Sequence, residues 1–126
     1  MIIGLGLDLA EVPRIADMVE RWGERFTRKL FTERERAFAA ERANSAQHLA
    51  ARFAAKEATL KALGVPRGLS WHEMEVVGGG RQRPHMILTG QALRAAEALG
   101  VTRLHLTLTH ADTVAAAVVI AEGVTP

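Results

Sequence analysis

A chain of 126 residues has the size of one domain, since common domains run about 100–150 residues. Hydrophobic residues make up 48% of the chain and charged residues 24%, which indicates one buried core and excludes a largely disordered protein. The absence of cysteine excludes a disulfide framework, a thiolate metal site and a cysteine nucleophile. A formal net charge of +2 is too small to indicate nucleic-acid binding by itself.

The first apolar segment does not fit a signal peptide. Asp8 interrupts it, Glu11 follows it, and neither a basic leader nor a small-residue cleavage site is present. The longest apolar run near the other end, residues 114–121, is far shorter than the roughly 20 residues that span a bilayer. We therefore expect a soluble, cytoplasmic protein with no membrane partner.

The first half of the chain is predicted to be a strand followed by helices. Residues 1–9 are apolar enough for a buried strand, in which Gly4, Gly6 and Asp8 share one face and leave room for a close neighbour. Pro13 suits the first turn of a helix. Apolar residues at helical spacing follow it and predict one apolar helical stripe, namely Ile15, Met18, Val19, Trp22 and Phe26, of which the first four are expected to pack inward.

Two further helices are predicted before residue 65. Thr32 and Glu35 form a capping-box pattern that opens a helix extending to about Glu41. Residues 47–63 form the longest helical stretch, which ends at Gly64.

The second half is mostly strand. Strands are predicted at 71–77, 85–88, 104–109 and 114–121, with a helix at 90–99. The last two strands are separated by a short turn and form a hairpin. We expect an α+β fold of one domain spanning residues 1–126, with an antiparallel sheet packed against the long helix.

Two residues at strand ends could carry chemistry. Asp8 ends an apolar strand, where a carboxylate costs several kcal/mol unless something compensates it. It is either a functional group, an exposed strand end, or an N-cap of the helix that begins at Pro13. His110 follows Thr109 at the end of another strand, and is either a ligand-binding group or a hydrogen-bonded residue at the edge of the core.

The long helix carries a cluster of charges. Arg52 and Lys56 are four residues apart, as are Glu57 and Lys61. One interpretation is a solvated face with a Glu57–Lys61 ion pair. The other is a carboxylate for Mg²⁺ beside a lysine for the phosphates that the metal bridges.

Together these segments resemble the holo-acyl-carrier-protein synthases, the small homotrimeric 4′-phosphopantetheinyl transferases. Residues 6–15 are similar to that family's opening motif of Gly-x-Asp, five residues and Arg-Ile. Residues 53–62 are similar to its Phe-Ala-x-Lys-Glu-Ala helix followed by Lys-Ala. Thr109-His110 and residues 115–120 resemble its closing Ser-His motif and alanine-rich strand, with Thr109 in place of serine. The segment Arg81-Gln82-Arg83 is more basic than the family's usual turn.

The resemblance implies transfer of 4′-phosphopantetheine from coenzyme A to a serine of apo acyl carrier protein, with release of 3′,5′-ADP. It implies Mg²⁺ as the cofactor, bound by Asp8 and Glu57. Asp8, Glu57 and Lys61 would be the catalytic residues, and Arg52, Lys61 and His110 would contact coenzyme A. The base that accepts the serine proton stays open between Glu57 and a metal-bound water.

A homotrimer with active sites between neighbouring subunits is also implied by the resemblance. The apolar hairpin supports it, because a small monomer would not leave such strand surface exposed. Arg14 and Arg21 lie two helical turns apart on one face of the helix that follows Pro13. Because acyl carrier proteins are generally acidic, we expect these two arginines to bind the carrier protein.

Two other function classes compete with this interpretation. A nucleic-acid-binding module could use the basic stripe of Arg14, Arg21, Arg25, Arg28 and Lys29. Aromatic residues make up only 5% of the chain, tyrosine is absent and acids interleave the stripe, so we expect no nucleic-acid partner. A coenzyme-A-dependent acyltransferase would need neither Asp8 nor a divalent metal. The sequence leaves open the physiological carrier protein, the tolerance for acyl-coenzyme A, a second metal and the role of residues 81–83.

Overall fold

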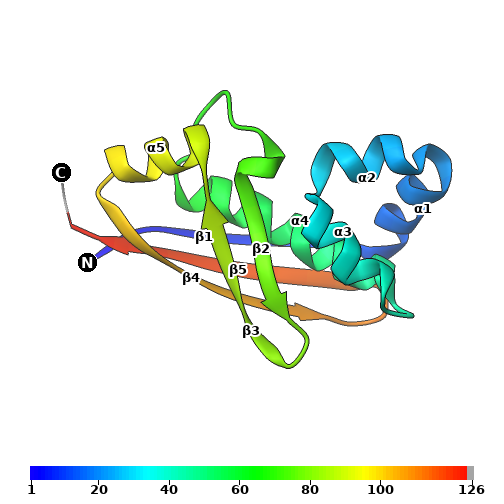
Figure 1. Cartoon of the computed structure of the whole chain (residues 1–126). Helices are drawn as coiled ribbons and strands as arrows, with labels where there is room; N and C mark the ends of the chain where they lie inside the picture. Colours follow the sequence, from blue (N-terminus) through cyan, green and yellow to red (C-terminus); the bar gives the residue numbers. More distant parts are fainter. Residues whose placement is uncertain (125–126) are drawn as a thin grey trace.

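A three-stranded antiparallel sheet and one long helix form the centre of the molecule (Figure 1). The computed structural model describes residues 1–124. In chain order the elements are β1 (Ile2–Glu11), α1 (Val12–Trp22), α2 (Glu24–Leu30), α3 (Glu33–Ala40), α4 (Ser45–Ala62), the 3₁₀ turn η1 (Trp71–Glu73), β2 (Met74–Gly79), β3 (Gln82–Leu88), α5 (Gly90–Ala98), β4 (Val101–His110) and β5 (Val114–Gly123). The predicted α+β class, the long helix and the closing hairpin are confirmed.

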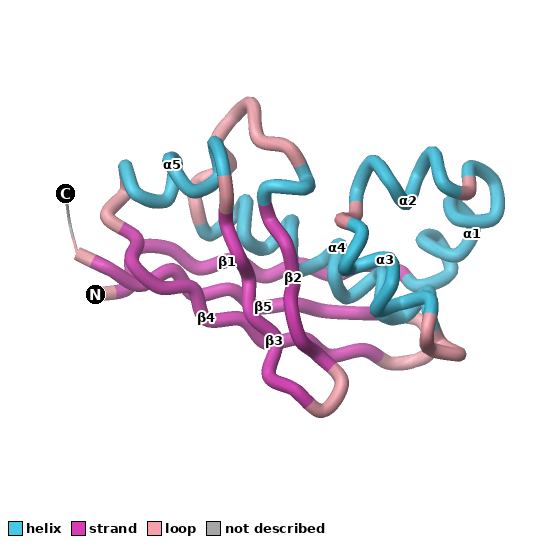
Figure 2. The backbone as a smooth tube through the Cα atoms, viewed as in Figure 1, coloured by secondary structure: helices cyan, strands magenta, loops and turns pink. Residues whose placement is uncertain are grey.

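The two sheets have different sizes and positions. The larger has the order β1-β5-β4, so the last strand of the chain is central, and β2 and β3 form a separate two-stranded sheet. β3 contacts β4, and β2 contacts α4, so the hairpin closes over one side of the long helix. In Figure 2 the helices α1 to α3 gather at one end of the molecule, and both termini lie at the other.

The glycines of β1 explain how closely the sheet approaches α4. A Cβ atom at Gly4 would overlap the carbonyl oxygen of Ala62, and one at Gly6 would overlap that of Ala58. Any side chain at either position would therefore push β1 away from the helix. The close approach expected from Gly4 and Gly6 is confirmed, and the neighbour is the backbone of α4.

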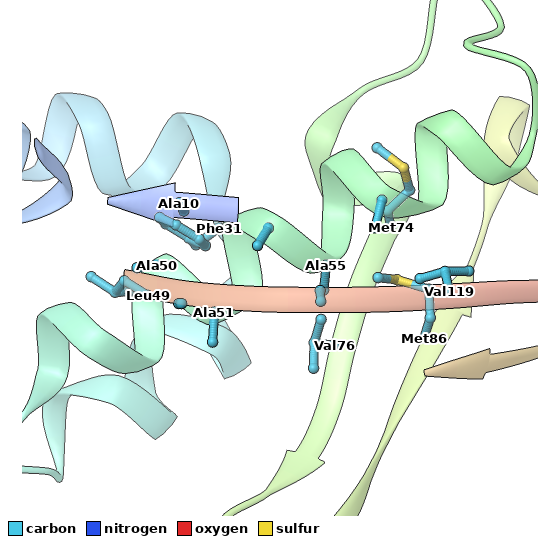
Figure 3. Close-up of a cluster of buried hydrophobic side chains, with 14 of the residues drawn as sticks. Ala10, Phe31, Leu49, Ala50, Ala51, Ala55, Met74, Val76, Met86 and Val119 are labelled. Atoms are coloured by element: carbon cyan, nitrogen blue, oxygen red, sulfur yellow. The ribbon is translucent and has the colours of Figure 1, made fainter. Parts of the chain in front are cut away.

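Small side chains also dominate the core between α4 and β5. Figure 3 shows Ala51 and Ala55 of the helix in one cluster of buried side chains with Val76 of β2 and Val119 of β5. The buried alanines of α4 are Ala50, Ala51, Ala54, Ala55, Ala58 and Ala62. β5 buries Ala115, Ala117, Val119 and Ala121 on its inner face. Because the buried residues of the two surfaces are mostly small, helix and sheet can pack at short range.

One charged pair is fully enclosed. Lys56 Nζ lies 2.8 Å from Glu35 Oε1, and both side chains have no exposed surface. Lys56 also donates hydrogen bonds to the carbonyl oxygens of Trp71 and Met74, and Glu35 accepts one from the backbone N–H of Val76. The pair therefore joins α3, α4, η1 and β2.

Two local predictions need correction. The apolar stripe after Pro13 is not one helix, because the backbone turns at Gly23 with φ +52° and α2 starts anew. Trp22, expected in the core, is 49% exposed. The strand expected from Trp71 starts only at Met74, because Ser70 and Glu73 form a capping box around η1.

The outer face of the larger sheet is apolar and uncovered. Leu5, Leu7 and Leu9 of β1 point away from α4 and are 57–66% exposed. They lie beside Ile120, Val118 and Ala116 of β5 in the strand register. No helix within residues 1–124 combines the length and apolar character needed to cross a bilayer.

Candidate active site

The contact between β1 and α4 brings Asp8, Glu57 and Lys61 together. Asp8 shares the inner face of β1 with Gly4 and Gly6, and its side chain is 11% exposed. Lys61 Nζ lies 2.8 Å from Asp8 Oδ1 and donates a second hydrogen bond to the carbonyl oxygen of Leu7, at 3.1 Å. Glu57 and Lys61 are one turn apart on the same side of α4. Lys61 therefore pairs with Asp8 of β1 and not with Glu57, the partner expected on a solvated helix face.

The charges of these three residues are coupled. Burial raises the pKa of the Glu57 carboxyl, and the nearby carboxylate of Asp8 raises it further, against the opposing effects of Lys61 and Arg14. The hydrogen bond to Asp8 raises the pKa of the Lys61 ammonium, which therefore stays charged. Two neighbouring carboxylates, of which Glu57 has a raised pKa, form a site where a cation would relieve repulsion. We call Asp8 and Glu57 the carboxylate site.

The donor set of the carboxylate site fits Mg²⁺. This ion takes six oxygen ligands, is commonly held by one or two carboxylates, and keeps several waters and substrate phosphate oxygens. No group of three or more histidine, aspartate or glutamate side chains arranged to hold a metal occurs within residues 1–124, so a site of dedicated protein ligands alone is not formed there. Asp8 and Glu57 would therefore hold the ion and leave its remaining positions to water and substrate.

A cavity of about 460 Å³ opens beside the carboxylate site. Glu57 and Arg14 line it together with the apolar side chains of Leu9, Phe53 and Met18. Met18 also lines a second cavity, of about 430 Å³, as do Trp22, Arg25, Phe26, Lys29, Leu30 and Trp71. The two cavities share Met18 and Phe26, so they adjoin each other along α1 and α2.

Arg52 and His110 lie in a different place. With His48, Thr109 and Gln82 they line a cavity of about 330 Å³ under the β2–β3 turn. We call it the cationic cavity. The Arg52 guanidinium is 2% exposed, donates a 2.6 Å hydrogen bond to the carbonyl oxygen of Gly78, and has its pKa lowered to about 10 by burial.

The carboxylate site and the cationic cavity are on opposite sides of the same subunit. His48 and Glu57 are nine residues apart, which is about two and a half turns of a helix with 3.6 residues per turn, so they face opposite ways. In the sheet, β5 separates Asp8 on β1 from Leu108 on β4, which lines the cationic cavity. Of the three basic residues that share the charge cluster of this helix with Glu57, Lys61 lies close enough to influence its pKa, whereas Lys56 pairs with Glu35. Arg52 faces the other cavity.

The remaining predicted site residues lie on α1. Arg14 and Arg21 are both exposed, and Arg21 forms an i,i+4 ion pair of 3.4 Å with Asp17. Arg14 is close enough to Glu57 to influence its pKa, so this residue also borders the carboxylate site. Sequence reasoning missed His48, which stands one turn before Arg52 on α4. That i,i+4 spacing was the available signal.

Comparison with known proteins gives a consistent result. Residues 4–119 match the model of the 4′-phosphopantetheinyl transferase superfamily. The holo-[acyl-carrier-protein] synthase of Anaeromyxobacter dehalogenans is 49% identical over 129 aligned positions that cover both chains completely. A solved holo-(acyl-carrier-protein) synthase of Bacillus anthracis, in complex with coenzyme A (3′,5′-ADP), is 31% identical with a TM-score of 0.78, covering 98% of this chain and 99% of that one.

A Chronobacterium ammoniagenes synthase solved as a coenzyme A complex is also similar. It is 30% identical with a TM-score of 0.81, and the match covers 95% of this chain and 96% of that one. Sequence and fold therefore agree over nearly the full length of the chain. The chain belongs to the holo-[acyl-carrier-protein] synthase family of the 4′-phosphopantetheinyl transferase superfamily.

Proposed function

We propose that this protein transfers the 4′-phosphopantetheine group of coenzyme A to a serine hydroxyl of an apo acyl carrier protein, in an Mg²⁺-dependent reaction. The observation that carries the proposal is the convergence of Asp8, Glu57 and Lys61, two carboxylates and an ammonium group, beside an open cavity. Metal-assisted transfer of a phosphoryl group from one oxygen to another needs such an arrangement. A cytoplasmic location remains part of the proposal.

The reaction defines what each group must do. The serine oxygen forms a bond to the β-phosphorus of coenzyme A, the bond from that phosphorus to the bridging oxygen breaks, and 3′,5′-ADP leaves. Mg²⁺, when bound, supplies positive charge for the diphosphate. Lys61 is half-exposed at the edge of the cluster, so its ammonium group can reach a phosphate oxygen and stabilise the charge that develops there. The serine proton passes to Glu57 or to a water at the carboxylate site.

Arg52 and His110 provide the second half of the coenzyme A site in this proposal. The cationic cavity would bind the 3′-phosphate and the adenine end. Because it lies on the far side of α4 and the sheet from Glu57, one subunit does not present both halves to one molecule. A neighbouring copy that places its cationic cavity against the carboxylate site would complete it.

The outer sheet face supports a homotrimer with active sites of this composite kind. Leu5, Leu7 and Leu9 form an exposed apolar row, which a small protein normally covers. Three copies packed around an axis would bury this row in a closed assembly. The same packing would set the β1 edge of one subunit near the β4 edge of the next.

The carrier protein is proposed to bind at α1. Arg14 lies between the carboxylate site and the exposed face of the helix, and Arg21 continues that face two turns further. An acidic carrier bound there would deliver its serine to the cavity that Glu57 lines. Bidentate bonds from arginine to carboxylate would orient the carrier as well as attract it.

A mass measurement tests the reaction class. The protein is incubated with coenzyme A, Mg²⁺ and an apo carrier protein, and the intact mass of the carrier is recorded. A gain of one phosphopantetheine group, abolished by EDTA, is expected. A carrier that gains only an acyl group from an acyl-coenzyme A, whether or not EDTA is present, would instead identify an acyltransferase and overturn the proposal.

A further inference from the structure

His48 is the group of the cationic cavity that neither the motifs nor the proposed reaction accounts for. It is half-buried on α4, and its ring centroid lies 5.2 Å from that of His110 on β4, with the planes at 71°. Its other neighbour is Phe38 of α3, at 5.3 Å in the same edge-on arrangement. The imidazole is therefore held between two elements, and it lines the cavity together with His110.

The surroundings of His48 carry positive charge without an ion-pairing carboxylate. Arg42 and Arg52 both place their guanidinium groups over the ring of Phe38, at 3.4 and 3.8 Å from its centre. Within residues 1–124 none of Arg42, His48, Arg52 and His110 forms an ion pair, and no carboxylate lines the cavity. Glu35 raises the pKa of Arg52, but this carboxylate forms its ion pair with Lys56.

Arg52 also has an unused donor. Its Nε–H is buried and has no hydrogen-bond partner among the described residues, although the side chain lines the cavity. A buried donor without a partner is costly, so a ligand that accepts from it gains affinity. Excess cations, two imidazoles and a free guanidinium donor are the features that recognise a doubly charged phosphomonoester.

We propose that His48 binds the terminal phosphomonoester of coenzyme A together with His110 and Arg52, and that one proton is taken up by the two imidazoles when this phosphate binds. The inference rests on the proposed function, which places that phosphate in the cationic cavity. Its new content is the role of His48 and the pH dependence of binding that follows from a pair of adjacent imidazoles.

The direction of the pH dependence follows from the charges around His48. In the free protein its pKa is lowered below the ordinary value of 6.5 by burial and by the charges of His110, Arg42 and Arg52. A bound dianion favours the protonated ring and raises that pKa. For the dianionic ligand, affinity is therefore greatest at a pH below the free-state pKa of His48, falls as the pH rises from that pKa to the bound-state pKa, and levels off above it. Because the phosphomonoester gains its own proton at a pH of about 6, the observed affinity also falls at lower pH, and the net proton uptake is the uptake by the protein less the release by the ligand.

Binding of 3′,5′-ADP, measured by calorimetry, tests the inference without catalysis. 5′-AMP, which lacks only the 3′-phosphate, is the matched probe. His48→Phe keeps the ring packed between Phe38 and His110 but removes the charge and the donor. His85→Gln, on the exposed side of β3, is the control. Titrations at pH 5.5 to 8.5 in two buffers of different ionisation enthalpy count the protons taken up.

The wild-type protein is expected to take up close to one proton with 3′,5′-ADP near pH 6.5, and less with 5′-AMP. His48→Phe should weaken 3′,5′-ADP binding about 10- to 100-fold at pH 6, leave 5′-AMP binding nearly unchanged and reduce proton uptake. His85→Gln should behave as wild type. If His48→Phe binds 3′,5′-ADP with wild-type affinity and proton uptake, the role of His48 is overturned, whereas the proposed coenzyme A site is unaffected. Failure of the wild-type protein to prefer 3′,5′-ADP over 5′-AMP would overturn the proposed coenzyme A site as well.

Discussion

Lys61 Nζ is bonded to Asp8 Oδ1 at 2.8 Å, although 53 residues separate the two in the sequence. The contact exists because Gly4 and Gly6 let β1 lie directly against the backbone of α4. In the free protein the lysine neutralises one of two neighbouring carboxylates. A divalent cation bound by Asp8 and Glu57 would take over that role, and the ammonium group would then be available to a phosphate oxygen. The same residue can thus stabilise the empty site and act on the substrate.

The first prediction concerns the two carboxylates. Asp8→Asn and Glu57→Gln each keep the shape of the side chain but remove a charged metal ligand. We expect each to reduce transfer to the carrier protein by at least about 100-fold, with partial recovery at high Mg²⁺, as measured by intact mass over time. Glu97→Gln, which changes an exposed carboxylate on α5, is the control and should have normal activity.

Folding of these variants must be checked in the same samples. Either substitution removes the repulsion between the two carboxylates, which contributes to the raised pKa of Glu57 in the wild-type protein. The unfolding temperature should therefore not fall strongly. Near-normal turnover by either variant at low Mg²⁺ would show that the carboxylate site is not the metal site.

The second prediction tests the close approach of β1 to α4. Gly6→Ala introduces a methyl group that overlaps the carbonyl oxygen of Ala58, so the strand must move. Overpacking of this kind costs about 1–3 kcal/mol of unfolding free energy, and more where backbone must shift. Because the shift displaces Asp8 from Glu57, we expect activity to fall further than the loss of folded protein explains.

Gly64→Ala is the matched comparison. Gly64 has φ +78°, but a Cβ atom there would meet nothing within 4 Å. The cost is then only the strain of a left-handed residue, about 1–2 kcal/mol, with no displacement of the carboxylate site. Urea denaturation and turnover of both variants separate the two effects, and equal activity losses per kcal/mol would contradict the proposed link between packing and catalysis.

The sequence was sufficient for the fold class and for placing Asp8 on a strand and Glu57 on the long helix, the two elements that the structure brings together. Apolar content and helical spacing identified the strand of Asp8 and the helix of Glu57. The family resemblance implied that the two residues act at one site. The sequence could not reveal the ion-pair partner of Lys61, because an i,i+4 pattern describes contacts within one helix and the actual partner, Asp8, is on β1. It also placed Trp22 in the core, since helical periodicity cannot show that the backbone turns at Gly23 and leaves this ring at a cavity wall.

The cationic cavity shows a second limit of this kind. Its side chains come from α4, β4 and the β2–β3 turn, and the signal for His48 is only its spacing from Arg52. A charged side chain of α4 lies near Glu57 or near His110 according to the face of the helix that it occupies. That choice depends on the packing of the alanine-rich face against the sheet, and tertiary contacts of this type are not encoded in a local pattern.

The third prediction concerns the enclosed pair of Lys56 and Glu35. Lys56→Met leaves the Glu35 carboxylate buried without its counter-charge, which should cost about 3–5 kcal/mol of unfolding free energy. The double variant with Glu35→Gln should recover about 1–3 kcal/mol, because the buried charge is then absent. Urea denaturation at one fixed protomer concentration measures both. A double variant no more stable than Lys56→Met would show that the charge is not the cause.

The fourth prediction concerns assembly. Leu7 is 57% exposed in the middle of the apolar row on β1, so Leu7→Glu should place a charge in the proposed trimer interface. We expect light scattering to give a trimer for the wild-type protein and a smaller species for this variant, with transfer largely lost. Leu93→Glu changes a 42% exposed leucine on α5 and should remain trimeric. A fully active wild-type monomer at micromolar concentration would exclude the composite site.

The fifth prediction concerns the carrier-protein surface on α1. Arg14 and Arg21 are seven residues apart and exposed, whereas Ile15 of the same helix is buried. The two are not equivalent. Arg14 borders the carboxylate site through its influence on Glu57, while Arg21 is held by Asp17 at 3.4 Å in an exposed ion pair that contributes little to stability. Arg21 can therefore exchange Asp17 for a carboxylate of the carrier at small cost.

Charge reversal distinguishes carrier binding from a purely structural role for this helix. Arg21→Glu should raise the KM for the carrier protein strongly, leave the KM for coenzyme A nearly unchanged, and flatten the salt dependence of kcat/KM, because a steering charge is lost. Arg14→Glu should do the same and also lower kcat, since it adds negative charge beside Glu57. Arg94→Glu on α5 is the matched control and should leave the carrier KM and the salt response unchanged. If both α1 variants bind the carrier as the wild-type protein does, the carrier binds elsewhere and α1 serves only to support the cavity walls.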